Sequence, residues 1–233
     1  VTVIDCHASP GGKMRTVESD AGPVDAGPTV MTMRHVFDDL FAACGTALDD
    51  HVTLTSDRTL ARHWWSDGST LDLFADPEAS ARAVADFAGP AEAAAFRRFS
   101  DRARQLFDAF DAPMMQAAAP RVTDLTRQVL AAPALIPALA PLRTLARALA
   151  SEFRDPRLRQ LFGRYATYVG GSPYRSPAVL ALIWHAEATG VWAVKGGMHR
   201  LAQAMVGVAQ AGGATFRLGT HVARIEMQRG RAA

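Results

Sequence analysis

The first apolar segment of the chain ends in a carboxylate and is followed by a pair of glycines. Residues 1–4 (VTVI) are typical of a strand, Asp5 follows them, and the glycine pair of Gly11-Gly12-Lys13 begins six residues further on. In dinucleotide-binding βαβ units, a carboxylate at the end of the second strand accepts hydrogen bonds from ribose hydroxyls. Glycines let the backbone approach a pyrophosphate, and Lys13 is placed to offset its charge. The pattern alone is short and also occurs by chance.

A second glycine pair lies in similar surroundings near the other end of the chain. Residues 190–195 (GVWAVK) favour a strand, Gly196-Gly197 a turn, and residues 198–211 a helix. Strands are then predicted at 215–218 and 222–227, with a turn at 228–231. A strand and glycine pair that lead into a helix, added to the carboxylate and glycine pair near residue 5, favour a nucleotide-binding α/β domain.

These segments together resemble one family. Residues 5–16, 25–29 and 196–201, with the predicted strand at 222–225, are similar to carotenoid desaturases, the phytoene-dehydrogenase-like FAD enzymes of the amine-oxidase flavoprotein superfamily. The resemblance extends over essentially the whole chain. Within the family, residues 165–185 most resemble bacterial 1-hydroxycarotenoid 3,4-desaturases, also called methoxyneurosporene dehydrogenases.

The resemblance implies FAD as the cofactor and gives several residues a role toward it. Asp5 would bind the ribose, although the family usually has Glu there. The other implied FAD contacts are Gly11, Gly12 and Lys13 beside the pyrophosphate and isoalloxazine, Gly196 and Gly197 at the flavin, and the Val222 backbone at the adenine edge. Ala193-Val194-Lys195 replaces the usual aromatic-proline approach, so Lys195 has no assigned role.

The implied reaction is desaturation of a carotenoid in carotenoid biosynthesis, at C-3,4 of an acyclic hydroxy- or methoxy-carotenoid. The flavin takes a hydride from an allylic carbon, and a proton is lost from the neighbouring carbon. No catalytic base is assigned; His185 is a weak candidate, and the electron acceptor is not encoded in this stretch. A C40 polyene needs an apolar tunnel, which the tryptophans and the apolar stripe at 96–110 would line unless they are ordinary core.

Composition excludes several other classes of protein. The 25 basic and 23 acidic residues give a net charge of +2, which argues against a nucleic-acid partner. The two cysteines suit a reducing cytosol, and the seven histidines are not paired at metal-ligand spacing, so no metal is expected.

We expect the protein to be cytoplasmic and peripherally attached to the inner or intracytoplasmic membrane. Residues 121–164 carry eight arginines against three acids around an apolar run broken by prolines, which suits adsorption to a membrane surface; a solvated helical face is the alternative.

The predicted fold class is α/β, an incomplete Rossmann-type FAD-binding domain with an inserted, mostly helical substrate domain. Residues 1–50 and 190–233 would form the first domain, and residues 51–189, strands followed by helices, the substrate- and membrane-facing domain. The chain begins without Met, inside a predicted strand, so we expect it to be a fragment of a longer protein lacking both ends.

Two alternatives remain open from the sequence. One is a flavin amine oxidase, which would need an aromatic cage for an amine around the flavin. The other is a non-catalytic, isoprenoid-binding peripheral membrane protein that has lost the cofactor. The presence of Asp5 and of both glycine turns argues against this second alternative.

Overall fold

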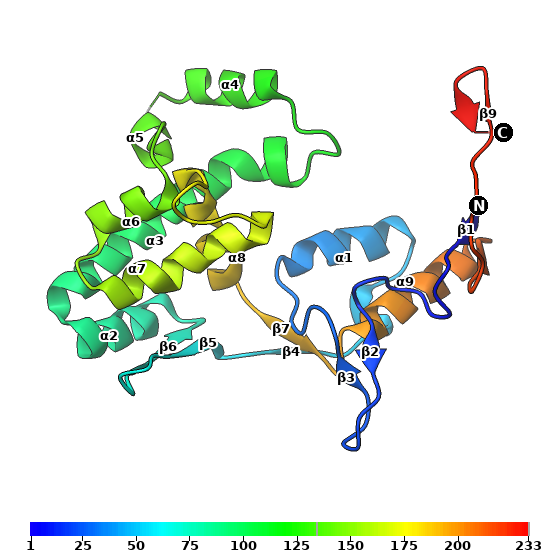
Figure 1. The fold of residues 1–233 in the computed structure, drawn as a ribbon, viewed down its shortest axis with the longest axis horizontal. Helices are drawn as coiled ribbons and strands as arrows, with labels where there is room; N and C mark the ends of the chain where they lie inside the picture. Colours follow the sequence, from blue (N-terminus) through cyan, green and yellow to red (C-terminus); the bar gives the residue numbers. More distant parts are fainter. Residues whose placement is uncertain (134, 233) are drawn as a thin grey trace. The chain divides into compact units, whose positions relative to one another are not determined.

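A computed structural model describes residues 1–133 and 135–232 (Figure 1). The chain forms two compact units, which are described separately. The first contains residues 1–56 and 191–233, and the second contains residues 57–190. Mixed strands and helices in the first unit and a largely helical second unit make the fold class α/β.

The first unit is built around a parallel pair of strands and one long helix. β1 (Thr2–Ile4) pairs in parallel with β8 (Thr215–Arg217), with Val3 opposite Phe216. The helix α9 (His199–Ala211) leads into β8 through a turn at Gly212-Gly213, as the glycine pattern predicts. The amide N–H of Asp5 donates to the Arg217 carbonyl oxygen (3.1 Å), so the pairing continues to the end of β1.

Shorter elements complete the first unit. A hairpin joins β2 (Thr16–Val17) and β3 (Val24–Asp25), and β4 (Leu54–Ser56) pairs antiparallel with β7 (Trp192–Val194). The helical spacing of apolar residues over 34–44, with Gly45 after them, predicts a helix, and the structure confirms it as α1 (Arg34–Ala43). A 3-10 turn, η1 (Leu48–Asp50), follows it. The apolar core of this unit consists of Met31, Phe41, Leu48, Val52, Val194, Met198 and Leu201.

The strand predicted at 222–227 is wrong for most of its length. Residues 218–226 have no regular structure, and β9 covers only Met227–Gln228. A strand is stable only where its main-chain N–H and C=O groups form hydrogen bonds with a neighbouring strand. No described strand pairs with 222–226. The turn predicted at 228–231 is confirmed, because β9 pairs with β10 (Arg231–Ala232) through Arg229-Gly230.

The second unit begins with a hairpin of β5 (Thr59–Trp64) and β6 (Thr70–Phe74). Sequence predicts a two-residue type I′ turn at Asp67-Gly68, but only Gly68 has a positive φ (83°). The Gly68 N–H donates to the Trp65 carbonyl, and the Trp65 N–H donates to the Ser69 carbonyl. This is a longer loop with glycine in the left-handed position. The Asp67 side chain accepts from the N–H and the hydroxyl of Ser69, which favours this turn.

Helices form the rest of the second unit. In chain order they are α2 (Pro77–Ala88), α3 (Pro90–Phe110), the π-helical turn η2 (Asp111–Met115), α4 (Val122–Ala131), α5 (Leu135–Leu139), α6 (Leu145–Glu152), α7 (Pro156–Gly163), the 3-10 turns η3 (Arg164–Val169) and η4 (Ala178–Ala181), and α8 (Leu182–Ala188). The amphipathic pattern at 96–110 is confirmed as one face of α3. Phe96 and Phe99 on that face are fully buried, in ring contact with Phe162 at 6.0 and 4.6 Å.

Asp76-Pro77 and Asp155-Pro156 each predict a helix start, with aspartate as the cap and proline at the first helical position, and both predictions are confirmed. The side chain of Asp76 accepts from the Glu78 N–H at the start of α2, and that of Asp155 accepts from the Arg157 N–H at the start of α7. Ser176-Pro177 has the same pattern and predicts a third cap, but it does not cap a helix, because a 3-10 turn follows. The Ser176 N–H donates to the Ser172 carbonyl, and the Ser176 carbonyl accepts from the Leu145 N–H.

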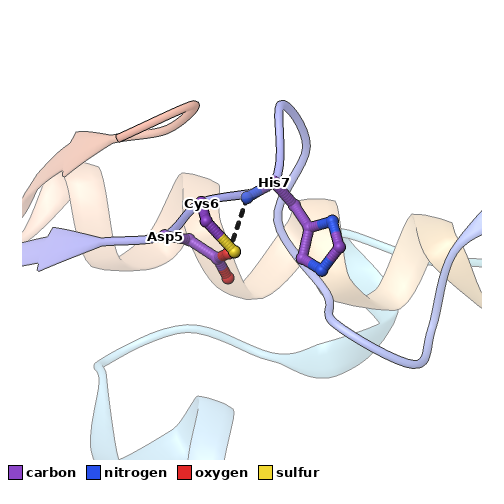
Figure 2. Close-up of side chains that lie close together, drawn as sticks. All are labelled: Asp5, Cys6 and His7. Carbon is purple, nitrogen blue, oxygen red and sulfur yellow. Dashed lines mark hydrogen bonds between the residues drawn. The ribbon is translucent and has the colours of Figure 1, made fainter. Parts of the chain in front are cut away.

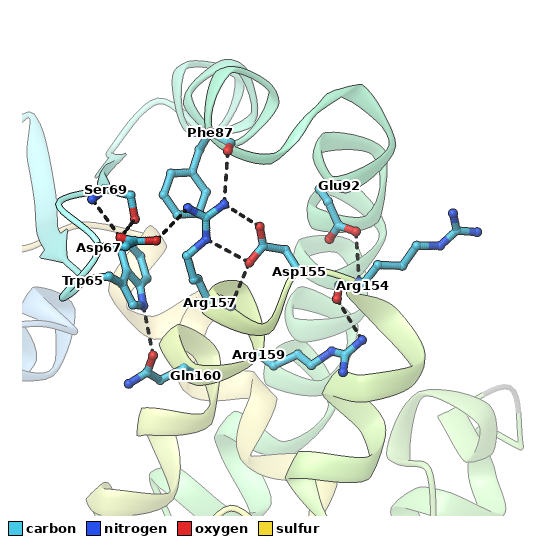
Figure 3. A network of polar contacts seen from close by, with 10 residues as sticks. All are labelled: Trp65, Asp67, Ser69, Phe87, Glu92, Arg154, Asp155, Arg157, Arg159 and Gln160. Atoms are coloured by element: carbon cyan, nitrogen blue, oxygen red, sulfur yellow. Dashed lines mark hydrogen bonds and ion pairs between the residues drawn. The ribbon is translucent and has the colours of Figure 1, made fainter.

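Asp155 also belongs to a larger polar network (Figure 3). Its carboxylate accepts from the Arg157 guanidinium at 2.7 and 3.2 Å, and the same guanidinium lies 4.0 Å from the Phe87 ring centroid. In the same view, Trp65 Nε1 donates to Gln160 Oε1, and the carboxylate of Glu92 in the first turn of α3 accepts from the Arg154 N–H. The network joins the hairpin loop and three helices by side-chain contacts.

The two aspartate caps allow a matched stability comparison. Loss of a cap costs about 0.5–2 kcal/mol. Asp155→Ala additionally breaks a half-buried ion pair at 2.7 Å, whereas the pair of Asp76 with Arg82 is exposed, at 3.5 Å, and contributes little. We therefore expect about 2 kcal/mol for Asp155→Ala and about 1 kcal/mol for Asp76→Ala, measured by urea unfolding. The hydrogen bond from Arg157 is the largest cause that lowers the pKa of Asp155 below its usual 3.8. Its contribution is therefore present above pH 3.8 and is lost as the pH falls through the lowered pKa. Equal losses in the two variants would contradict the role given to Arg157.

Candidate functional site

The carboxylate predicted to bind ribose lies where β1 ends and is held by its own main chain. Asp5 is half-buried, and its Oδ1 accepts from the His7 N–H at 2.8 Å. The Thr220 N–H donates to the Asp5 carbonyl and the Gly219 N–H to the His7 carbonyl, each at 2.9 Å. Residues 5–7 are thus fixed to the segment that follows β8.

The glycine pair at 11–12 forms a tight turn for which glycine is required at one position. Gly11 has φ 111°, and a Cβ there would lie 2.6 Å from the Met14 carbonyl oxygen and 3.0 Å from Ala202 Cβ. A side chain at this position would therefore separate the turn from α9. Gly12 has φ 57° and open space around it, so a ligand could reach its backbone.

Two cavities adjoin this turn. One, of about 330 Å³, is almost wholly apolar and is lined by β1, α9 and β8, with Asp5 and Gly11 at its wall. The other, of about 540 Å³, is lined by His7, Gly12, Lys13, Arg15 and residues 26–28. The second cavity brings two cationic side chains beside the open glycine, an arrangement that can offset phosphate charge.

The second glycine pair lies directly before α9. Gly196 and Gly197 have φ of 85° and 91°, and a Cβ at Gly197 would lie 2.9 Å from Asp25 Oδ1. Asp25 Oδ2 accepts from the Met198 N–H at 2.9 Å, while Asp25 Oδ1 is buried without a hydrogen-bond partner in the described part of the chain. Glycine is thus needed for the close approach of β3 to the start of α9.

Two residues that sequence reasoning gave no role connect the glycine turns. Asp25 links β3 to α9, and His199 Nδ1 is 2.7 Å from the Met14 carbonyl oxygen in the first turn. Asp25 stands two positions before Gly27, and His199 two positions after Gly197, so both adjoin the glycine motifs in the sequence. Their contacts, however, join residues far apart in the sequence, and no local pattern predicts such contacts. The structure therefore places the two glycine motifs side by side in the first unit.

Of the remaining predicted site residues, Val222 lies in the irregular segment after Thr220 and is 46% exposed. The Thr220 N–H donates to the main-chain carbonyl of Asp5, so the segment that carries Val222 begins beside Asp5. The contact of the Val222 backbone with the adenine edge stays a prediction. Lys195 is exposed, and its N–H donates to the Thr53 carbonyl.

The second unit contains a buried carboxylate that the sequence did not single out. Glu187 Oε2 accepts from Arg164 Nη2 at 2.5 Å and from the Tyr165 hydroxyl at 2.9 Å, and Oε1 accepts from the Tyr168 hydroxyl at 2.7 Å. Burial and the Glu187 carboxylate raise the pKa of Tyr168 to about 12. Both carboxylate oxygens of Glu187 are thus satisfied, which suits a structural role.

His185, the weak candidate for a base, packs on a ring of the core instead. Its imidazole centroid is 5.2 Å from that of Phe107, and burial lowers its pKa below the usual 6.5. No described contact joins it to Glu187, two residues further on in α8. Nothing in this geometry favours His185 as a proton acceptor.

The sequence matches the family profile of flavin-containing amine oxidoreductases over residues 1–233, and the chain belongs to that family. The cofactor of this family is the flavin FAD. The fold agrees, since a putrescine oxidase variant superimposes with a TM-score of 0.55 at 15% identity, over 97% of this chain and 46% of that one.

Among curated proteins, the chain is similar to enzymes named hydroxyneurosporene desaturase. It is 60% identical to the one from Cereibacter sphaeroides over 232 residues, and 52% identical to the one from Rhodobacter capsulatus over 231 residues. These alignments cover 100% and 99% of this chain and 47% of each relative. The chain therefore spans about half the length of the relatives it matches.

The residues of the first unit fit the FAD that the family implies. The Asp5 carboxylate, the open backbone of Gly12 and the pair Lys13 and Arg15 provide polar groups and access for a dinucleotide. A Cβ at Gly27 would collide with the Lys13 carbonyl oxygen, so this glycine holds the basic loop in place. The donor set is chemically that of a ribose–pyrophosphate site.

Proposed function

We propose that the protein of which this chain forms all or part is an FAD-dependent carotenoid desaturase, acting at C-3,4 of an acyclic hydroxy- or methoxy-carotenoid. The observation that carries the proposal is that the His199–Met14 contact joins the two glycine turns, beside a cavity that Asp5 and Gly11 line. The similarity to hydroxyneurosporene desaturases supports the substrate class.

The chain's own residues serve the cofactor by binding and orienting it. Asp5 would hold the ribose hydroxyls, Lys13 and Arg15 the pyrophosphate, and the open backbone of Gly12 would let the cofactor approach. FAD, when bound, supplies the hydride acceptor for the new double bond. Gly197 and Asp25 would fix the start of α9, whose N–H groups carry a partial positive charge.

The stripe at 96–110, expected either to line a polyene tunnel or to form core, is buried along its whole length. Phe96 and Phe99 are 1% and 0% exposed and contact other rings. An apolar cavity of about 370 Å³ lies at the far end of α3, lined by Phe110, Met114, Thr126, Val129, Leu130, Leu139 and Val179. We assign this cavity, rather than the Phe96–Phe99 region, to an apolar substrate.

The surface of the same region supports attachment to a membrane. Leu130, Ile136 and Leu142 are 73%, 45% and 103% exposed. Leu142 stands in a loop with φ 64°. Of the eight arginines, Arg157, Arg159 and Arg164 are half-buried and bond within the fold. Arg127, Arg143 and Arg147 are exposed; Arg127 pairs with Asp124 and Arg143 donates to Ser151 at the surface, where headgroups can also reach them. None of the described helices has the length and hydropathy to cross a bilayer.

We expect Arg143→Glu combined with Arg147→Glu to release the protein from anionic liposomes. Each basic residue near such a surface contributes about 1 kcal/mol, so reversing two charges should weaken binding at least about 100-fold in low salt. Co-sedimentation measures it, with Arg82→Glu and Arg104→Glu, exposed arginines of α2 and α3, as the charge-matched control. Unchanged sedimentation of the first variant would place the membrane contact elsewhere.

The proposed function is tested with the native protein loaded with FAD. Incubation with hydroxyneurosporene in liposomes and an added electron acceptor should yield a product with two fewer hydrogens and a longer absorbing polyene. Oxidation of putrescine instead would indicate the amine-oxidase alternative. Retention of the carotenoid without conversion and without flavin would indicate the non-catalytic alternative.

A further inference from the structure

Three consecutive residues at the end of β1 turn their donor atoms toward one another. The carboxylate of Asp5, the thiol of Cys6 and the imidazole of His7 each offer one atom, and these atoms all lie within 4.8 Å of one another (Figure 2). In an extended strand, consecutive side chains point to opposite faces. Their convergence therefore depends on the bend at residues 5–10, which the structure shows and the sequence alone does not.

The backbone that carries these three side chains is fixed in the bent form. Asp5 Oδ1 accepts from the His7 N–H at 2.8 Å, which closes a turn over Cys6. Three main-chain hydrogen bonds, of 2.9 to 3.1 Å, tie Asp5 and His7 to Arg217, Gly219 and Thr220. The main chain of residues 5–7 is thus already ordered in the folded protein, so metal binding does not have to offset the entropy lost in ordering it.

We propose that Asp5, Cys6 and His7 form a binding site for a thiophilic divalent cation of the Zn²⁺ class. Around a tetrahedral Zn²⁺ with metal–ligand bonds of about 2.0–2.3 Å, ligand atoms stand roughly 3.4–3.6 Å apart. Exposed Cys6 and His7 can close the remaining distance by side-chain rotation. The thiol loses its proton to solvent when its sulfur binds the metal, and a water completes the coordination.

The surroundings select the kind of ion. His7 also lines the polar cavity that contains Lys13 and Arg15, so a cation held mainly by charge is repelled there. A cation that binds through partly covalent bonds to sulfur and nitrogen loses a smaller share of its binding free energy to this repulsion. The site should therefore take Zn²⁺, Cd²⁺ or Co²⁺, and not Mg²⁺ or Ca²⁺, which prefer oxygen ligands.

The site also has a consequence for the cofactor, which rests on the proposed function. The carboxylate that would bind the metal is the one assigned to the FAD ribose, so the two ligands exclude each other. Zinc would then inhibit the protein by keeping FAD out, and bound FAD would protect the site from zinc.

Cobalt titration of the reduced, FAD-free protein tests the site directly. Thiolate coordination of Co²⁺ produces an intense near-ultraviolet charge-transfer band, and tetrahedral Co²⁺ gives visible bands; Zn²⁺ should abolish both at one equivalent. Cys6→Ser should remove the charge-transfer band, and His7→Ala should weaken binding at least about tenfold. Cys44→Ser, at the end of α1 and likewise exposed, is the matched control and should change nothing.

The outcomes separate the site from the proposed function. A charge-transfer band that is absent, or that Cys44→Ser removes and Cys6→Ser does not, overturns the metal site whatever FAD does. FAD binding that Zn²⁺ lowers in the unsubstituted protein but not in Cys6→Ser supports mutual exclusion. A cobalt band that persists unchanged at saturating FAD overturns mutual exclusion and the ribose role of Asp5, while the metal site stands.

Discussion

Replacement of Glu187 by Ala is expected to lower the free energy of unfolding by about 3 kcal/mol. The substitution leaves the Arg164 guanidinium without its counter-charge and removes the acceptor of the buried Tyr165 hydroxyl. Breaking a buried ion pair from one side costs roughly 3–5 kcal/mol. The lower end applies because the Arg164 side chain is 33% exposed, whereas that of Glu187 is 10% exposed. Urea unfolding monitored by circular dichroism measures the loss.

Two further variants distinguish the charge from the packing. Glu187→Gln keeps an acceptor for the tyrosine hydroxyls and should cost less than Glu187→Ala. Glu187→Leu combined with Arg164→Met removes both charges together and should recover much of the loss, because an apolar pair of similar volume carries no uncompensated ion. If the double variant is as unstable as Glu187→Ala, the ion pair is not the source of the stability.

The second large effect concerns the flavin. Asp5→Ala is expected to weaken FAD binding to the native protein at least about tenfold, because a charge-assisted hydrogen bond is worth about 1.5–3 kcal/mol and the ribose offers two hydroxyls. Equilibrium dialysis with flavin fluorescence measures the change. Asp5→Glu should be mild, since the longer carboxylate still accepts from both hydroxyls.

Asp5→Ala removes the ribose contacts and also loosens the turn, because Asp5 accepts from the His7 N–H. Two further variants distinguish these causes of weaker FAD binding. Asp5→Asn keeps the acceptor for that bond and loses the charge, so it should still lose FAD affinity. Asp20→Ala, an exposed carboxylate in the β2–β3 turn of the same unit, is the matched control. If Asp5→Ala and Asp20→Ala retain equal amounts of flavin, the ribose assignment is wrong.

Several helices could be predicted from the sequence, because the pattern that indicates each of them lies within one short segment. The helix at 34–43, the aspartate–proline starts of α2 and α7 and the buried face of α3 depend on caps and periodicity within a single segment, and the structure has all of them. The glycine pairs were also visible, because a positive φ is a property of the residue itself.

The contacts between these elements could be found only in the tertiary structure, because they join segments far apart in the sequence. The contact of His199 with Met14, the bond of Asp25 to the start of α9 and the network around Glu187 join residues from 19 to 185 positions apart, which no local pattern encodes. The predicted strand at 222–226 failed for the same reason, since strand pairing is a contact between distant segments. The convergence of Asp5, Cys6 and His7 also depends on bonds to residues 217–220, more than 200 positions away.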